Sequence, residues 1–451
     1  MALHLLDSDT TIIAPATATG GAVVVVRISG PKAIAIADSM FHGRHKLADA
    51  KGYTLHYGDI VYDNGDVLDD VIVALFRTPH SYTGEDSVEI TIHGSEYITS
   101  ELIRLAIERG AVMATPGEFT QRAFLAGKMD LSRAEAVADI IASDSRWSHN
   151  VASTQMRGSY SKRLGTMRES LLRLCSLLEL ELDFSEEDVE FADRTELRKM
   201  LVNIESEVAQ LKSSFALGNV LKNGVVVAII GEPNVGKSTL LNTLVEDDRA
   251  MVSDIAGTTR DTIEATTTID GIRYRFIDTA GIRTTEDHLE QMGIDRTYRA
   301  MENAHIILHI TTADNPIFDE ISISPNQKYI QVINKIDNAI STNTPILDRS
   351  LYISAKYNIG IDKLRSALRE CTDTTQLNSS SVVVTNMRHY AALERASESL
   401  NMALQAISNN LPSDLLSEDI RQTLHHLGEI TGDITSDDIL HNIFSKFCIG
   451  K

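Results

Sequence analysis

The sequence predicts a multidomain α+β protein in which an α/β domain is inserted into a helical domain. The chain has 451 residues, enough for roughly three domains. Its N-terminal part mixes Gly-flanked β-rich runs with segments of helical spacing. Farther along, helical periodicity is interrupted by a block of short apolar runs that alternate with helical stretches, which is typical of a mainly parallel sheet.

An N-terminal α+β domain is expected over residues 1–118. Helical spacing of apolar residues predicts helices at residues 31–41 and 95–110. The β-rich runs are Ala22–Gly30, Val71–Phe76 and Ser87–Gly94. Together these elements predict a compact α+β unit.

The helical domain is expected in two parts, at residues 119–217 and 374–451. Apolar residues recur at i, i+3 and i+4 in the segments 117–144, 167–184 and 387–410. The acidic run Glu179–Glu190 could suggest a metal site, but a solvated helix end and loop is the favoured interpretation.

The inserted α/β domain is expected over residues 218–373. Helical stretches separate its short apolar runs, which is the pattern of strands and helices in a parallel α/β sheet. The runs lie at residues 224–231, 274–281, 305–310, 328–334 and 351–355.

Composition and charge indicate a soluble protein in a reducing cytosol. The formal net charge of −21 argues against broad binding to polyphosphates, although it does not exclude a local basic site. Three scattered cysteines without a CxxC pair argue against a disulfide framework or a zinc site. We find no signal-peptide pattern and no apolar run long enough for a membrane span, so we expect a cytoplasmic protein.

The stretch Gly231–Ser238, GEPNVGKS, satisfies the pattern G-x-x-x-x-G-K-[ST] between a β-rich run and a helical stretch. Its glycines let backbone N–H groups wrap phosphates. Lys237 would supply positive charge to the β- and γ-phosphates, and Ser238 would offer its hydroxyl to Mg²⁺. The alternative is a chance match in a Gly-rich turn, which the companion motifs argue against.

Companion motifs follow in the order expected of a GTP-binding domain. Thr258 and Thr259 can close onto Mg²⁺, and Asp278-Thr-Ala-Gly281 can reach the Mg²⁺ shell and the γ-phosphate. Asn334-Lys-Ile-Asp337 and Ser354-Ala-Lys356 end later strands. An Asp carboxylate accepts two N–H bonds from guanine, which adenine cannot supply. These segments resemble the translation-factor-like GTPases.

The residue that follows DTAG is Ile282, where Ras-like proteins carry a glutamine that orients the attacking water. Either hydrolysis is poor or another group places the water. Asn234 offers part of an answer, since its side-chain carbonyl can help to hold a monovalent cation where an arginine finger would otherwise act. Simple turn chemistry also explains an asparagine at this position.

The whole chain resembles the MnmE (TrmE) family of tRNA uridine-modification GTPases. The motifs that carry the resemblance are VRISG, SYTGED, PGEFTQRAFLAGKMDLSRAEAVADII, DIAGTTRD, EITGDITSDDIL and the ending FCIGK. The resemblance implies a folate-binding-like N-terminal α+β domain, a central helical domain and an inserted Ras-like α/β P-loop GTPase domain.

The resemblance also implies the reaction and the partners. It implies a homodimer joined through the N-terminal domains, and K⁺-dependent GTP hydrolysis activated when the GTPase domains meet. It implies a complex with the FAD-containing partner MnmG. That complex adds an aminomethyl or carboxymethylaminomethyl group to carbon 5 of the wobble uridine of tRNA, with a one-carbon unit from tetrahydrofolate in its 5-formyl or 5,10-methylene form.

Matching positions assign the nucleotide and ion contacts. The GTP-binding residues implied by the resemblance are Asn234, Val235, Gly236, Lys237, Ser238, Thr239, Ser253, Asp254, Ile255, Ala256, Gly257, Thr258, Thr259, Asp278, Thr279, Ala280, Gly281, Asn334, Lys335, Ile336, Asp337, Ser354, Ala355 and Lys356. The implied Mg²⁺ ligands are Ser238 and Thr259. The implied K⁺ ligands are Asn234, Ser253, Ile255 and Thr258.

Matching positions also assign chemistry outside the nucleotide site. Glu290 matches a glutamate that helps to orient the water, although by pattern alone it is an exposed helix charge. The implied folate contacts are Arg27, Glu89, Lys128 and Lys451, where cations and a carboxylate suit a pterin ring and a glutamate tail. Ordinary surface pairs are the alternative for these residues.

Cys448 is the residue that the resemblance places at the centre of the folate chemistry. A thiolate is a good nucleophile, and Lys446 and Lys451 are nearby cations. The alternative is a buried small residue that anchors the C-terminal segment. The loop Pro15–Val23 lacks the arginine that the family often has there, which leaves the contacts of this loop open.

Two other functions stay open on the sequence. One is a ribosome-assembly GTPase, which usually carries a basic RNA-binding module; here the segment Pro412–Lys451 has seven acids and three cations, which disfavours it. The other is a pure switch that binds folate for regulation while the partner does all the chemistry.

Overall fold

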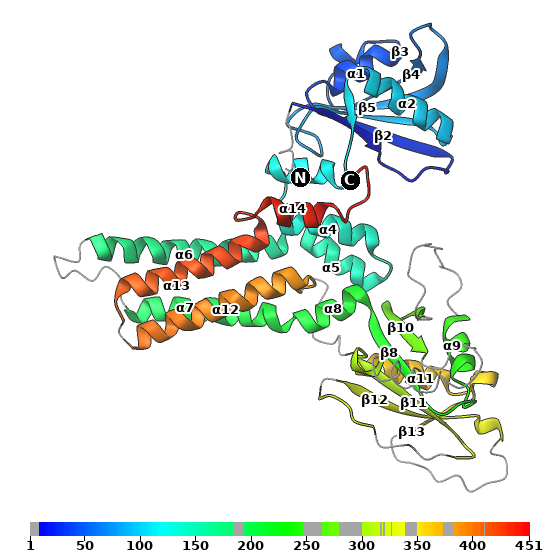
Figure 1. The fold of residues 1–451 in the computed structure, drawn as a ribbon, viewed down its shortest axis with the longest axis vertical. Coiled ribbons are helices and arrows are strands. Elements are labelled where there is room, and N and C mark those ends of the chain that lie inside the picture. Colours follow the sequence, from blue (N-terminus) through cyan, green and yellow to red (C-terminus); the bar gives the residue numbers. More distant parts are fainter. Residues whose placement is uncertain are drawn as a thin grey trace, which may run out of the picture. The chain divides into compact units, whose positions relative to one another are not determined.

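The computed structural model describes residues 9–183, 194–246, 264–278, 300–315, 318, 321–325, 327–338, 350–372, 382–409 and 411–451. The chain divides into two compact units, whose elements are labelled in Figure 1. The first unit comprises Met1–Ala138, Gln155–Glu205 and Arg395–Lys451, and the second comprises Asp139–Thr154 and Ser206–Glu394. No helix in the described ranges is both long and apolar enough to cross a bilayer.

The first unit begins with a seven-stranded sheet in the order β3-β4-β5-β6-β2-β1-β7. Neighbouring strands are antiparallel except β1 and β7, which are parallel. The strands are β1 Thr11–Pro15, β2 Val23–Ser29, β3 Phe41–Gly43, β4 Thr54–Val61, β5 Val67–Phe76, β6 Ser87–His93 and β7 Ala111–Met113. Helices α1 (Ala33–Met40) and α2 (Glu96–Glu108) pack on one face of this sheet.

The two faces of this sheet differ in burial. Because side chains alternate between the faces of a strand, Val71, Val73 and Leu75 of β5 are buried in the core that α1 and α2 complete. Ile72 points to the other face and is 47% exposed. The strands and helices predicted in this domain are confirmed. The sequence analysis missed β1, β3, β4 and β7, since none of them is a long apolar run flanked by glycine.

A buried ion-pair network closes the N-terminal domain around Arg122 of α3 (Glu118–Leu125). The guanidinium is 5% exposed and donates to Glu118 Oε1 at 2.9 Å and to Glu85 Oε1 at 3.1 Å. It also donates to the backbone carbonyl of Thr10 at 2.8 Å. One cation therefore ties the N-terminal strand to α3 and to the loop that precedes β6.

Helices of varied length form much of the rest of the first unit and part of the second. In order they are α3 Glu118–Leu125, α4 Leu131–Ala142, α5 Arg146–Met156, α6 Ser159–Asp183, α7 Arg194–Ser213, α8 Phe215–Asn223, α12 Met387–Ser408, α13 Ser413–Thr431 and α14 Asp437–Phe444. In the first unit, α6 and α13 run side by side (Figure 1). Glu179 pairs with Arg421 at 2.6 Å, and Glu181 pairs with Arg194 at 3.4 Å. Glu179 and Glu181, at the start of the acidic run, thus form ion pairs with residues of other helices.

The helical segment predicted over residues 117–144 is divided into α3 and α4. Gly127 has φ of 68°, a left-handed conformation that commonly ends helices. Asp130 then caps α4, because its Oδ1 accepts from the backbone N–H of Arg133 at 3.1 Å. Helical spacing on both sides of this turn concealed the break in the sequence analysis.

The second unit contains a six-stranded sheet in the order β13-β12-β11-β8-β10-β9. Its strands are β8 Val225–Ile230, β9 Glu264–Ile269, β10 Ile272–Asp278, β11 Ile306–Thr312, β12 Lys328–Asn334 and β13 Ser350–Tyr352. All neighbours are parallel except β9 and β10. The helices α9 (Lys237–Glu246) and α11 (Ile361–Cys371) belong to this domain.

This mainly parallel sheet confirms the α/β architecture expected from the sequence. The five predicted apolar runs are β8, β10, β11, β12 and β13. In the central strand β8, Val227 and Ile229 enter one core cluster and Ala228 enters another, so both faces of the sheet are covered. The antiparallel strand β9 was missed, because its sequence EATTTI is not an apolar run.

Replacing Arg122 by methionine should lower the free energy of unfolding by about 3–5 kcal/mol, because it leaves the buried Glu118 carboxylate without its cation. Chemical denaturation followed by circular dichroism measures the change. Arg104→Met is the matched control, since Arg104 is 46% exposed and its ion pairs are screened by solvent. Equal losses in the two variants would contradict a special role for the buried network.

Candidate nucleotide site and C-terminal segment

The loop between β8 and α9 has a backbone that requires glycine at both ends. Gly231 has φ of 143° and Gly236 has φ of 99°. A Cβ atom at Gly231 would lie 2.1 Å from the carbonyl oxygen of Ile310, and one at Gly236 would lie 2.4 Å from Asn334 Nδ2. Asn234 also lies in the left-handed region, with φ of 65°. The loop therefore lies tightly against the neighbouring strands.

Lys237 closes this loop onto itself. The side chain is 6% exposed, and its Nζ donates to the carbonyl oxygens of Gly231 at 2.7 Å and Glu232 at 2.9 Å. Ser238 and Thr239 are exposed in the first turn of α9. The N–H groups and positive dipole end of a helix favour a bound anion, so the loop and α9 have the elements of a phosphate site.

The side chain of Asn334, at the end of β12, connects the phosphate loop to the two motifs on the base side. Its Nδ2 donates to the carbonyl oxygen of Val235 at 2.9 Å. Its Oδ1 accepts from the backbone N–H of Ala355 at 3.0 Å. Lys335 Nζ adds a second link, donating to the carbonyl oxygen of Asn234 at 2.6 Å.

Asp337, which the sequence analysis assigned to the guanine base, lies in the turn after β12. Ser354 donates from its Oγ to Asp337 Oδ1 at 2.5 Å, which orients the carboxylate. Ala355 is held again by Thr243 of α9, whose hydroxyl donates to its carbonyl oxygen at 3.0 Å. Ile336 lies in the turn after β12, and Lys356 is exposed. The structure thus brings three predicted motifs together.

The remaining predicted nucleotide residues are described only in part. Asp278 is the last residue of β10, beside Ile229 of the parallel strand β8. The other predicted residues lie outside the described ranges: Ser253, Asp254, Ile255, Ala256, Gly257, Thr258, Thr259, Thr279, Ala280, Gly281, Ile282 and Glu290.

Arg27 and Glu89, two of the residues matched to folate contacts, form an ion pair on the N-terminal sheet. They are direct neighbours on β2 and β6, and Arg27 donates to Glu89 Oε1 at 2.8–2.9 Å. The guanidinium also lies over the rings of Tyr82 and Phe119, 5.2 and 5.5 Å from their centroids, where cation–π attraction fixes its plane. Burial raises the pKa of Tyr82, so this ring is an uncharged phenol at neutral pH.

The C-terminal segment packs against the N-terminal domain close to this pair. Gly117 lies so near α14 that a Cβ there would be 2.6 Å from the carbonyl oxygen of Phe444. A Cβ at Gly450 would lie 1.9 Å from the carbonyl oxygen of Pro15. Pro15 is the register partner of Val26, which precedes Arg27. The tail is thereby fixed beside the strand that carries Arg27.

The two predicted lysines of this region have backbone partners. Lys128 donates from its Nζ to the carbonyl oxygen of Pro79 at 2.8 Å. The backbone N–H of Lys451 donates to the carbonyl oxygen of Cys448 at 3.3 Å, which forms a turn at the end of the segment. Lys451 is half-buried.

The three cysteines differ in exposure. Burial raises the pKa of Cys175 to about 11 and also raises that of Cys371, which disfavours their thiolates at neutral pH. Cys448 is exposed, so the alternative of a buried anchoring residue is wrong. The buried residue that anchors this segment is its neighbour Phe447, which packs in a core with Leu131 and Phe444.

Sequence reasoning missed the groups that position the predicted residues. Asn334 was matched as a nucleotide contact, but its hydrogen bonds to the phosphate loop were not expected. Tyr82 and Phe119 were not assigned a role, although both lie in the motifs SYTGED and PGEFTQRAF. The presence of these aromatics in two of the quoted motifs was the available signal.

The fold and the loop define the class of protein: a P-loop GTPase whose α/β domain is joined to α+β and helical parts. Residues 11–128 match a domain family described as the N-terminus of the GTP-binding protein TrmE. Residues 131–448 match the MnmE helical domain family. The tRNA modification GTPase MnmE of Bacteroides fragilis is 48% identical over 98% of this chain and 99% of its own length. That of Cytophaga hutchinsonii is 49% identical over 98% of both chains. The chain belongs to the MnmE family of tRNA modification GTPases.

Solved structures match part of the chain. Era from Aquifex aeolicus is 27% identical over 39% of this chain and 66% of its own, with a TM-score of 0.26. The G domain of the Thermotoga maritima FeoB protein is 22% identical over 33% of this chain and 99% of its own, with a TM-score of 0.24. The family assignment does not rest on these matches.

Proposed function

We propose that this protein is the GTP-hydrolysing subunit of a complex that modifies carbon 5 of the wobble uridine in tRNA. The group added is aminomethyl or carboxymethylaminomethyl, and its carbon comes from a tetrahydrofolate derivative. The nucleotide part of this proposal is supported by one observation: the side-chain amide of Asn334 joins the phosphate loop to Ala355. The family assignment supports the tRNA half.

The nucleotide assignments come from the matched motifs, and the contacts of Asn334 support those in the phosphate loop and after β13. The residues matched above would contact GTP, with Lys237 and the first turn of α9 at the phosphates and Asp337 at the guanine edge. Ser238, whose side chain is exposed in that turn, would hold Mg²⁺ with Thr259. Mg²⁺ would bridge and neutralise the phosphate oxygens. Glu290 would orient the attacking water.

Potassium would complete the phosphate site. Asn234 is exposed, and its backbone is held by the bond from Lys335 to its carbonyl oxygen. Its side-chain oxygen is thus available as a K⁺ ligand, together with Ser253, Ile255 and Thr258. A cation here would stabilise the charge that develops on the phosphates, as an arginine finger does in other GTPases.

GTP hydrolysis should slow by tenfold or more when K⁺ is replaced by Na⁺ at equal ionic strength, on the order of 1.4 kcal/mol or more in the barrier. Phosphate release under single-turnover conditions measures the rate. Asn234→Ser should abolish the difference between the two ions. Asn358→Ser is the matched control, because Asn358 also has a positive φ in this domain; it should keep the difference. Equal rates in K⁺ and Na⁺ for the native protein would exclude the potassium assignment.

The folate half rests on the C-terminal segment. Two observations support it: Gly450 lies close against Pro15, whose strand is paired with that of Arg27, and Cys448, two residues before Gly450, is exposed. Arg27, Glu89, Lys128 and Lys451 would contact the pterin and glutamate groups of the folate. Cys448 would act as a nucleophile in the transfer of the one-carbon unit.

Deleting the gene should remove aminomethyl-type groups from wobble uridine, as measured by mass spectrometry of tRNA nucleosides. The native gene should restore them, whereas Cys448→Ser should not. Cys371→Ser is the control, because this thiol is half-buried and disfavoured as a thiolate. Full modification with folded Cys448→Ser protein would favour the pure switch. Unchanged modification in the deletion strain, with ribosome precursors accumulating, would favour the assembly GTPase.

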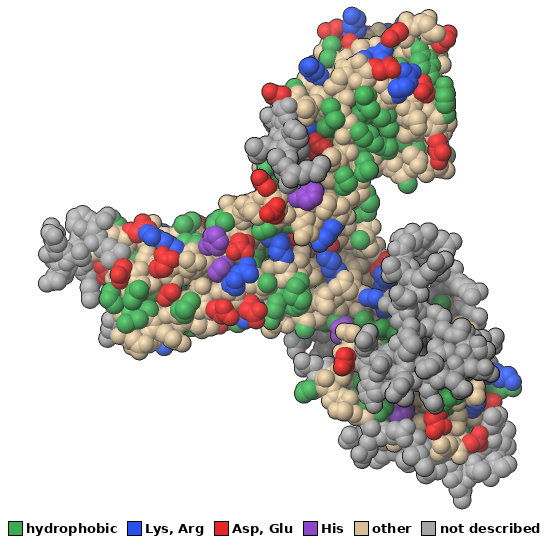
Figure 2. All heavy atoms as spheres, viewed as in Figure 1, with side chains coloured by type: hydrophobic (Ala, Val, Ile, Leu, Met, Phe, Trp, Pro, Cys, Tyr) green, Lys and Arg blue, Asp and Glu red, His purple; other side chains and the backbone are tan. Residues whose placement is uncertain are grey.

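A homodimer would form through the open face of the N-terminal sheet. Figure 2 shows hydrophobic side chains gathered on this domain. On that face Tyr57 of β4 is 69% exposed and lies opposite Ile72 of β5. Leu55 lies two residues from Tyr57 on the same strand and is 74% exposed. Its neighbour on β5 is Ala74, and the same row of the sheet continues with Glu89 of β6 and Arg27 of β2. The exposed apolar side chains Leu55, Tyr57 and Ile72 thus lie together on β4 and β5, and such a patch is typical of an interface.

Ile72→Glu should weaken this dimer at least tenfold, because it buries a carboxylate in the interface. Analytical ultracentrifugation measures the dissociation constant. Ile107→Glu is the matched control, since Ile107 has a similar exposure of 44% but lies on α2, which packs on the opposite face. A native protein that is monomeric at micromolar concentration, or equal weakening in both variants, would contradict this interface.

Three further assignments accompany the proposal. The FAD-containing protein MnmG would be the partner, which co-elution of the purified proteins tests. The cytoplasm would be the compartment, which cell fractionation tests. The domain boundaries would be 1–118, 119–217, 218–373 and 374–451, with the second and fourth segments forming one domain, which limited proteolysis tests.

A further inference from the structure

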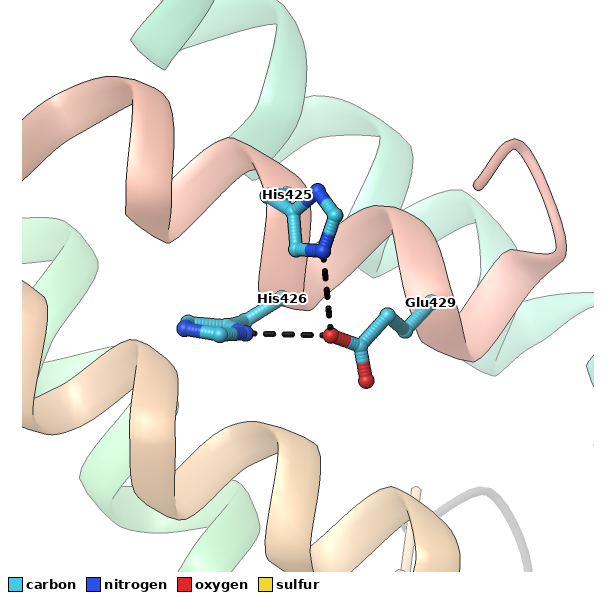
Figure 3. A group of neighbouring side chains, drawn as sticks. All are labelled: His425, His426 and Glu429. Carbon is cyan, nitrogen blue, oxygen red and sulfur yellow. Dashed lines mark hydrogen bonds and ion pairs between the residues drawn. The ribbon is translucent and has the colours of Figure 1, made fainter. Parts of the chain in front are cut away.

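Two histidines and a glutamate on α13 converge on one point. Figure 3 shows the rings of His425 and His426 directed at the same carboxylate oxygen of Glu429. His425 Nε2 lies 3.4 Å from Glu429 Oε1, and His426 Nδ1 lies 3.1 Å from the same atom. The three donor atoms lie within 4.8 Å of one another. Neither the nucleotide site nor the folate assignments use these residues.

The two separations that involve Glu429 match those of ligands around one transition-metal ion. With metal–ligand distances of about 2.0–2.1 Å, two ligand atoms of a tetrahedral zinc site lie about 3.3 Å apart. The observed 3.1 and 3.4 Å agree with this value. Imidazole nitrogens with a carboxylate oxygen are also a donor set that zinc, cobalt and nickel accept.

The surroundings hold two of the three ligands in place. His426 is 17% exposed and Glu429 is 21% exposed, whereas His425 is 49% exposed. Arg395 of α12 donates to Glu429 Oε2 at 2.5 Å, so Oε1 is the oxygen that faces the histidines. This bond fixes the carboxylate much as outer-shell partners fix ligands in metal sites.

Arg395 also opposes the binding of a metal ion at this place. Its Nε donates to His426 Nδ1 at 3.4 Å, which is the atom that would bind the metal. That long, weak hydrogen bond has to be given up on binding, and the guanidinium charge lowers the affinity for a cation.

We propose that His425, His426 and Glu429 form a binding site for a single divalent transition-metal ion such as zinc. Three protein ligands leave at least one coordination position for water or for a ligand from another molecule. The site belongs to α13 of the first unit, so it is separate from the Mg²⁺ and K⁺ positions of the nucleotide domain. Binding would replace the weak bond of Arg395 to His426 by stronger bonds within α13.

The test is a titration of the tag-free, full-length protein with Co²⁺, in the absence of nucleotide and with excess Mg²⁺ to occupy sites for hard cations. One equivalent of Co²⁺ should produce a visible absorption band, and Zn²⁺ should displace it. His426→Gln and Glu429→Gln should each weaken Co²⁺ binding at least tenfold. Because both variants keep a polar side chain on an intact helix, circular dichroism should show native folding.

Two controls keep the assignment specific. His45→Gln removes an exposed histidine outside the cluster and should leave the titration unchanged. His93→Gln tests the other group of possible ligands, in which Asp69 already accepts from the backbone and the ring of His93; it should also change nothing. Absence of a band in the native protein, an unchanged band in the His426 and Glu429 variants, or its loss in His93→Gln would overturn the proposal.

Discussion

The side-chain amide of Asn334 is the contact on which the nucleotide domain depends. An amide can donate through one atom and accept through the other, and Asn334 does both inside the protein, where it is 2% exposed. Its donor end meets the phosphate loop and its acceptor end meets the loop after β13. An aspartate would lack the donor and a leucine would lack both, so either would leave buried backbone groups without partners.

This contact explains why Gly236 cannot carry a side chain. Asn334 Nδ2 occupies the space where a Cβ would stand, so the glycine and the amide form a single arrangement. The parallel strands β8 and β12 end at the same edge of the sheet, with β11 between them. Sites in parallel α/β sheets commonly lie at that edge, because the loops that follow the strands meet there. Sheet order therefore positions the motifs, and the amide fixes their separation.

The sequence predicted the motifs of this site and most of its strands, because apolar runs and the glycine pattern are local signals. It did not predict β9, whose threonines give no apolar run, or the break at Gly127, where helical spacing continues on both sides. Contacts between distant segments were also missed. The hydrogen bonds of Asn334, the rings around Arg27 and the ion pair of Arg122 with Glu85 all join residues far apart in sequence, and no local pattern encodes them.

The fit of Gly450 against Pro15 has a consequence for how the protein is made. Pro15 belongs to the first strand of the chain, so it leaves the ribosome long before Gly450 does. The N-terminal sheet can pair its own strands in the meantime, but the surface beside Arg27 stays open until residues 444–450 arrive. A chain cut short before that point would lack the segment that lies against Pro15, and the surface beside Arg27 would stay open. Synthesis thus delays completion of the surface beside Arg27 until the C-terminal segment has been made.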